Sequence, residues 1–285
     1  MKPAICVFAF TLVSTAVLGL GSPAQEKPAT PDASKAPLQL AISSQGQKVA
    51  DVDIVLTLVH SGGAGQCGGG GGGGGMPACE AADHWQAKVK VRGKGGAENT
   101  SVFALTKKED LRKHLEGVAA RKIRIKLPDL VNISSATLSL RVGPHVPYGL
   151  VHGLIATAAK AGICQIEFAV VPAAAAAEQR LAVPLPLDES SRIMEAKTEG
   201  DLRIVVRVVN EKRECERQFG RAKFAMGAAG DVELRGKLEK STVDRKSPAI
   251  IAAEKGVPWQ AVVAVVDACH AAGRAVLFAN PDLAK

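Results

Sequence analysis

The stretch Val146-Pro147-Tyr148-Gly149 decides the fold, and its counterpart Val257-Pro258-Trp259 follows 111 residues later in the same setting. In both places the residues before the turn are typical of a strand, and those after it have apolar side chains at helical spacing. Proline fixes φ and lacks an N–H, which suits the first turn of a helix. The two turns therefore predict two helices that begin in the same way.

The similarity between the two halves extends well beyond the turn. At the same offset, the apolar positions Val151, Leu154, Ile155 and Ala158 correspond to Val262, Val265, Val266 and Cys269. Ala161-Gly162 then corresponds to Ala272-Gly273, Glu167-Phe168-Ala169 to Leu277-Phe278-Ala279, and upstream Leu111–Glu116 to Leu234–Glu239. Four matching blocks in the same order predict two homologous modules, the first with an insertion near 127–135.

Local patterns around the turns give the expected elements. Strands are predicted at 52–59, 88–92, 136–142, 163–171 and 202–209, and helices at 106–120 and 150–161. Thr106 and Glu109 form a sequence capping box at the start of the first helix. The expected fold class is α+β, with two tandem small modules, each a mixed β-sheet with two helices packed on one face.

Composition shifts divide the chain. Met1-Lys2, the apolar run from Ala4 to Gly21 and the small residues that follow it predict a signal peptide over 1–24. A flexible tether is expected over 25–45, the first module over 46–171 with a glycine-rich loop at 61–78, an Ala/Pro linker over 172–191, and the second module over 192–285. The alternative is an uncleaved N-terminal helix that anchors the chain in the inner membrane.

The run of strand, Val-Pro-aromatic turn, helix, Ala-Gly and strand resembles the periplasmic domain of the ExbD/TolR biopolymer-transport family. Val146-Pro147-Tyr148-Gly149 with Val151 and Ala161-Gly162-Ile163 matches the family pattern closely. The second copy matches more loosely, because Gln260 replaces the glycine. The resemblance implies an envelope-side domain that dimerises, and a tandem copy could form that pair within one chain.

The seven residues of the two turns are the candidate binding residues: Val146, Pro147, Tyr148, Gly149, Val257, Pro258 and Trp259. The alternative interpretation is that Tyr148 and Trp259 only seal the core. One departure limits the resemblance, because motor members of the family carry an aspartate in the N-terminal membrane helix. Residues 5–21 here contain no carboxylate, His, Lys or Arg, so the proton-relay element is missing.

Candidate chemistry is sparse. Cys67 and Cys79 flank the glycine run and could form a disulfide, and with His60 and His84 they have ligand types suited to zinc. Their spacing fits no standard zinc module, so we expect no metal and no cofactor. No nucleophile elbow, phosphate loop or repeated carboxylate pair occurs, and we expect no catalytic residues.

The net charge of +8 favours anionic partners, but the basic residues are scattered and are not interleaved with aromatic ones. We therefore expect no nucleic-acid binding. The expected function is that of a non-enzymatic periplasmic accessory protein, which binds peptidoglycan or envelope proteins. The alternatives are a membrane-anchored transport component and a secreted metal-binding protein or hydrolase.

Overall fold

The computed structural model describes residues 39–47, 52–61, 82–93, 97–122, 133–172, 177–185, 202–210, 214–244 and 247–284. All of them belong to one compact unit, Ala33–Lys285. The predicted signal peptide, Cys67, Cys79 and nearly all of the glycine-rich loop lie outside the described residues. So does the predicted insertion near 127–135 up to residue 132.

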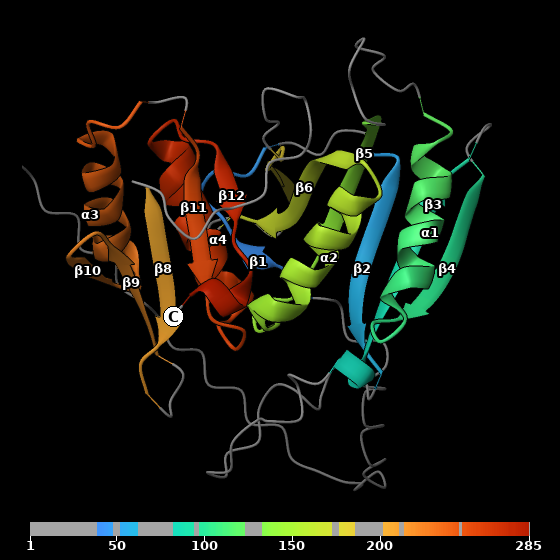
Figure 1. The fold of residues 1–285 in the computed structure, drawn as a ribbon, viewed down its shortest axis with the longest axis horizontal. Helices are drawn as coiled ribbons and strands as arrows, with labels where there is room; N and C mark the ends of the chain where they lie inside the picture. The colour runs from blue at the N-terminus through green and yellow to red at the C-terminus, as the bar shows by residue number, and fades with distance from the viewer. Residues whose placement is uncertain are drawn as a thin grey trace, which may run out of the picture. The chain divides into compact units, whose positions relative to one another are not determined.

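The first module is a mixed sheet with two helices on one face (Figure 1). Its elements are β2 (Ile54–His60), η3 (Ala82–His84), β3 (Trp85–Arg92), β4 (Glu98–Ala104), α1 (Lys108–Ala119), β5 (Ser134–Arg141), α2 (Tyr148–Lys160) and β6 (Ile163–Val171). β2, β3 and β4 form an antiparallel meander, while β2, β5 and β6 are parallel. The parallel strands β5 and β6 are joined through α2, as parallel pairs require a crossover connection.

The second module repeats this topology strand for strand. Its elements are β8 (Arg203–Val208), β9 (Cys215–Phe219), β10 (Ala222–Ala225), α3 (Ala228–Glu239), β11 (Ala249–Ala253), α4 (Trp259–Ala271), β12 (Val276–Phe278) and η5 (Pro281–Leu283). Here too the first three strands are antiparallel, and the remaining pairs are parallel. The predicted fold class, α+β with two modules that each contain a mixed sheet, is confirmed.

The cores follow from the predicted periodicities. In β2 the alternate residues Ile54, Leu56 and Leu58 are buried, as expected for a strand with one face on the core. Leu111 and Leu115 of α1 are buried, and so are their counterparts Leu234 and Leu238 of α3. The repeated sequence therefore encodes the same helix–sheet packing twice.

Three local expectations differ from the structure. α1 begins at Lys108, its N-cap position is Lys107, and no side chain caps it. The predicted Thr106–Glu109 capping box is thus wrong, because the Glu109 carboxylate is held by Arg112 instead. Residues 39–45, the last part of the expected tether, include β1 (Ala41–Ile42), and the expected linker contains β7 (Gln179–Ala182). Both short strands pair with β6, which gives the first sheet seven strands.

Candidate functional site: a cationic groove where the two modules meet

The two Val-Pro-aromatic turns contact each other. Pro147 and Pro258 form an antiparallel bridge. The N–H of Tyr148 donates to the carbonyl of Val257, and the N–H of Trp259 donates to that of Val146, both at 2.8 Å. Tyr148 and Trp259 are the first residues of α2 and α4, so their N–H groups have no acceptor inside their own helices. Each turn thereby supplies the acceptor that the other helix start lacks.

The aromatic side chains of the turns complete this junction. The hydroxyl of Tyr148 donates to the backbone oxygen of Ala279 in the second module at 2.8 Å. Trp259 lies edge-on to Phe168 of the first module, with ring centroids 4.7 Å apart. Both aromatic residues are 0% exposed, and burial raises the pKa of Tyr148 well above its ordinary value.

The structure thus places the seven candidate binding residues against one another. Val146, Pro147, Tyr148, Val257 and Trp259 are buried, whereas Gly149 and Pro258 are half-buried. Their contacts join the modules and offer little surface of their own to a separate partner. The surface available for binding lies beside the turns, and of the seven residues Gly149 alone lines it.

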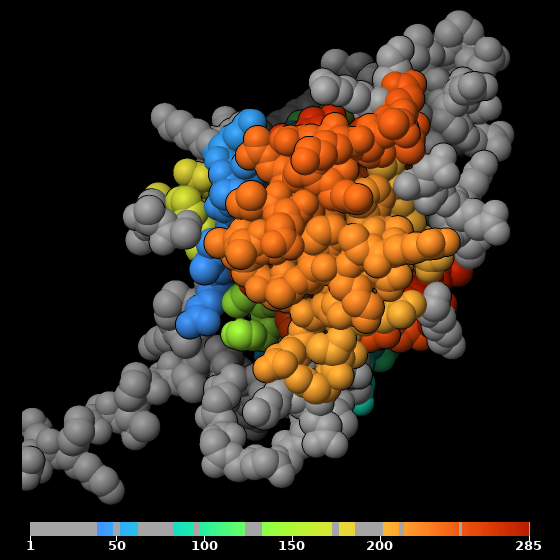
Figure 2. All heavy atoms as spheres, turned by 90° about the vertical axis from the view of Figure 1, so that its left-hand side faces the viewer, coloured from blue at the N-terminus to red at the C-terminus, as the bar shows by residue number. Residues whose placement is uncertain are grey.

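A short strap from the N-terminal side crosses from the first module to the second; we define it as residues 41–44. Ala41 and Ile42 pair with Val170 and Val171 of β6. On the other side, the amide of Gln260 bonds both backbone groups of Ile42, accepting at 2.6 Å and donating at 2.9 Å. In Figure 2 the blue atoms of the N-terminal region border the orange surface of the second module.

Asp267 of α4 holds the far end of the strap. One carboxylate oxygen accepts from the hydroxyl of Ser43 at 2.6 Å. The other accepts from the N–H of Ser44 at 2.6 Å and from its hydroxyl at 3.2 Å. Burial raises the pKa of Asp267, although these hydrogen bonds and the nearby His270 act in the opposite direction.

Gln260 and Gly149 occupy equivalent places in the two turns, and the structure explains why they differ. The backbone N–H of each bonds across the junction, Gly149 to Lys255 and Gln260 to Pro144. A Cβ on Gly149 would lie 3.3 Å from the side chain of Lys255. Glycine therefore permits the close approach on one side, while glutamine holds the strap on the other.

On the glycine side the surface is hollowed into a groove of about 540 Å³. Its floor is the small-residue face of α2 around Gly149, Gly153 and Ala156, and one wall is the start of α1 with Lys108. The second module closes one end with Lys255, Asn280 and Pro281. We call this hollow the junction groove; its volume falls within the range of small-ligand sites.

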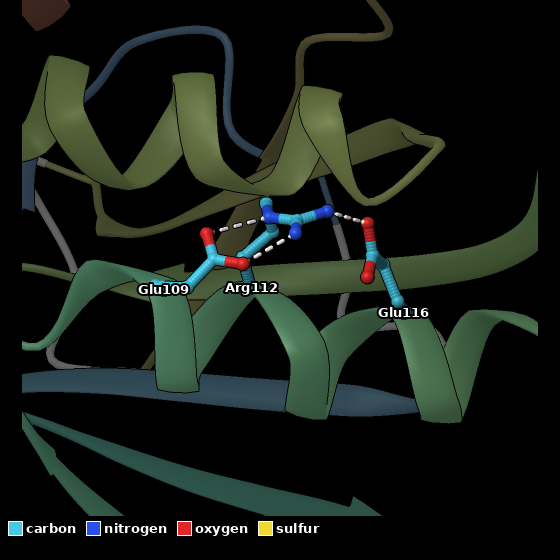
Figure 3. Close-up of polar contacts among 3 residues, drawn as sticks. All are labelled: Glu109, Arg112 and Glu116. Carbon is cyan, nitrogen blue, oxygen red and sulfur yellow. Dashed lines mark hydrogen bonds and ion pairs between the residues drawn. The ribbon is translucent and has the colours of Figure 1, made fainter.

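Positive side chains surround the junction groove. Lys108, Lys160, Lys255 and Arg112 line it, together with one acidic residue, Glu109. Figure 3 shows the guanidinium of Arg112 between the carboxylates of Glu109 and Glu116, so its charge is largely compensated. Within the described part of the chain, Lys108 and Lys160 form no direct ion pair. The hydrogen bond from Arg112 and the nearby charge of Lys160 both lower the pKa of Glu109, so this carboxylate partly offsets the charge of Lys160.

The remaining cation, Lys255, has an ion pair that can be exchanged. Its ammonium lies 2.7 Å from Asp282, but both side chains are more than half exposed, and such surface pairs contribute little. Burial lowers the pKa of His152 at the groove, and the nearby charge of Lys108 lowers it further. A backbone hydrogen bond with Phe278 acts in the opposite direction. His152 is thus neutral near pH 7, and the lysines carry the free positive charge.

The described histidines and cysteines do not gather into a metal site. The rings of His60 and His84 lie 5.9 Å apart, but no described group of three or more His, Cys, Asp or Glu side chains could hold a metal ion. Cys164 and Cys269 are buried free thiols, and burial raises the pKa of Cys269 to about 12. No helix in the described ranges is both long enough and apolar enough to span a bilayer.

The sequence interpretation missed the residues that build the groove and the strap. Lys108, Lys160 and Lys255 are far apart in the sequence, so no local motif marks them. Asp267 did leave a signal, because it is the single charged residue in the otherwise apolar run from Ala261 to Cys269. A buried-face carboxylate of this kind indicates a specific partner.

No family model matches the chain, and neither the curated proteins nor the solved structures contain a match. The resemblance to ExbD/TolR domains therefore rests on the motif residues alone.

Proposed function

We propose that the chain is a non-enzymatic, exported accessory protein of an ExbD/TolR-type envelope system. It acts by binding an anionic partner, either peptidoglycan or the envelope-side domains of motor subunits, and has no proton-relay aspartate of its own. The motif resemblance supports the family, and the sequence pattern of the N-terminus supports export.

The observation that carries the binding role is the junction groove with Lys108 and Lys160, two lysines that make no direct ion pair with a described side chain. Lys108 and Lys160 hold positive charge beside a concave surface of small residues. Positive charge around a concavity attracts anionic groups more strongly than the same charge on a flat surface. The groove needs both modules, because Lys255, Asn280 and Pro281 come from the second.

Co-sedimentation with insoluble peptidoglycan tests this proposal, using the full mature chain at low and at high salt. The double variant Lys108→Gln/Lys160→Gln should lower the bound fraction several-fold, because it removes the free charge of the groove. Its matched control is Lys237→Gln/Lys240→Gln, which removes two exposed charges at the end of α3. The control should bind like the unmodified chain.

Equal losses in the two double variants would contradict a role for the groove. Retention that disappears completely at moderate salt would show only ion exchange, since exposed charges are screened within about 8 Å at physiological ionic strength. The same variants, assayed against purified envelope-side domains of motor subunits, test the second kind of partner.

A further inference from the structure

The strap lies against the second module in the place that corresponds to the junction groove on the first. The strap lies along α4 between Gln260 and Asp267. At the offset of 111 that relates the two helices, these positions correspond to Gly149 and Ala156 of α2, both of which line the junction groove.

The remaining walls correspond as well. The strap pairs with Val170 and Val171, which follow Phe168 by two and three residues. Asn280 and Pro281 follow the equivalent Phe278 by the same steps, and they line the junction groove. Pro144 and Lys255 also correspond, and each accepts a hydrogen bond from the opposite helix start. One half of the pseudo-symmetric junction thus holds an extended segment, whereas no described segment lies in the other.

The two equivalent places differ in how they can hold a chain. Beside the strap, Val171 offers its backbone carbonyl to Ser43 at 3.0 Å. In the junction groove the carbonyls of Asn280 and Pro281 are used within η5, by Leu283 and Ala284. These two carbonyls are therefore not free to pair with a bound strand. In the junction groove the lysines attract a bound segment instead.

From this correspondence we infer that the junction groove binds an extended acidic peptide segment of a partner protein, in the place equivalent to the strap. The inference rests on the proposed binding function and specifies the ligand. The strap side presents the carboxylate of Asp267 to two serines, whereas the junction groove presents Lys108, Lys160 and Lys255. An occupant of the junction groove is therefore expected to carry acidic groups where the strap carries neutral serine hydroxyls.

The distribution of the lysines favours an extended ligand over a single small anion. Lys255 lies at Gly149, near the start of α2, and Lys160 is its last residue. These places are about 16 Å apart along a helix that rises 1.5 Å per residue. The Nζ of Lys108 lies between them, 3.4 Å from where a Cβ of Gly153 would be. An extended segment of about five residues covers this length.

A second copy of this chain is a poorer occupant. Its strap residues, Ala41 to Ser44, carry no charge. They match the hydrogen-bonding side chains of Gln260 and Asp267 but not a row of lysines. Charge complementarity thus selects an acidic peptide over exchange of straps between copies.

Fluorescence anisotropy with a labelled eight-residue peptide of alternating Asp and Ser tests the inference on the full mature chain. The neutral peptide of alternating Asn and Ser is the ligand control. The acidic peptide should bind, and Lys108→Gln/Lys160→Gln should weaken it about tenfold, whereas Lys237→Gln/Lys240→Gln should not. Inorganic phosphate at equal charge concentration should not displace the peptide.

Gly153→Leu provides a variant that fills the groove without changing charge. A Cβ at this position meets only the flexible end of Lys108, and leucine favours helix over glycine, so the variant should remain folded. It should abolish peptide binding. Equal binding of the neutral peptide, or unchanged binding to Gly153→Leu, would overturn the inference.

The two proposals fail in different ways. Retention on peptidoglycan that requires Lys108 and Lys160, without binding of the acidic peptide, would overturn the peptide inference and leave the proposed function standing. If the chain neither bound the acidic peptide nor was retained on peptidoglycan through Lys108 and Lys160, the proposed binding function itself would be wrong.

Discussion

At the scale of single residues, glycine is required at one position of α3 and not at another. A Cβ on Gly230 would lie 2.0 Å from the carbonyl oxygen of Ala225 and 2.9 Å from the guanidinium of Arg217. Arg217 is fully buried and donates to Asp231 and to the same carbonyl of Ala225. Gly230 therefore allows α3 to approach β10 closely enough for both terminal nitrogens of this buried guanidinium to find acceptors.

Gly230→Ala should destabilise the protein by about 1–3 kcal/mol, because backbone and a buried guanidinium must shift to make room. Gly236→Ala is the matched control in the same helix, since a Cβ there meets nothing within 4 Å. It should stabilise the protein by about 0.5–1 kcal/mol through helix propensity. Urea denaturation measures the free energy of unfolding of both variants. A change of the same sign in the two would contradict this account of α3.

At the scale of elements, the strap is held by polar contacts to one helix of the second module. Ser43 is 1% exposed, and its hydroxyl donates to Asp267. Ser44 adds two further hydrogen bonds to the same carboxylate. These contacts connect the edge of the first sheet to α4, so the strap contributes to the junction as well as to β6.

A double-mutant cycle of Ser43→Ala and Asp267→Ala tests the strap. Asp267→Ala should cost about 1–3 kcal/mol, because it leaves a buried hydroxyl and the N–H of Ser44 without their acceptor. The two changes share a contact, so the double variant should lose less than the sum of the single ones. Strict additivity in thermal or urea unfolding would mean that the contact does not form.

The carboxyl of Asp267 should also make the free energy of unfolding depend on pH. Burial raises the folded-state pKa of Asp267 above its unfolded value. The folded protein therefore holds the proton of the Asp267 carboxyl more tightly than the unfolded chain does. The stability that results is fully present below the unfolded-state pKa. That contribution is lost as the pH rises through the folded pKa. The free-energy difference between the unmodified chain and Asp267→Ala should accordingly be larger at mildly acidic pH than at pH 7.

At the scale of the whole molecule, the sequence predicts each module, and the family resemblance implies that the two could pair, but neither says which residues make the contact. Strands and helices follow from short-range periodicity, which a repeated sequence displays twice, and Leu111 and Leu234 pack accordingly. The pairing of Pro147 with Pro258 depends on contacts between distant segments. The groove depends on that pairing, so the joint role of Lys108, Lys160 and Lys255 could not be predicted from local patterns.

The sequence correctly predicts that each turn starts a helix, but it places the prolines inside the first helical turn. In the structure Pro147 and Pro258 are the N-cap residues, with extended backbone, and the helices begin at Tyr148 and Trp259. The tether and linker were the weaker predictions, because β1 and β7 are short and gain their stability from β6 rather than from their own residues. Composition cannot reveal such strands.

The central claim is that the paired turns join the modules and form the groove. Amide hydrogen exchange at Tyr148 and Trp259 tests this claim most directly. Both are the first residues of their helices, so only the other module can protect their N–H groups. Fragments covering 144–150 and 255–261 should show these two amides exchanging as slowly as amides in β6 and β12. Exchange of either amide at the rate of an unprotected peptide, while the strands stay protected, would contradict the pairing.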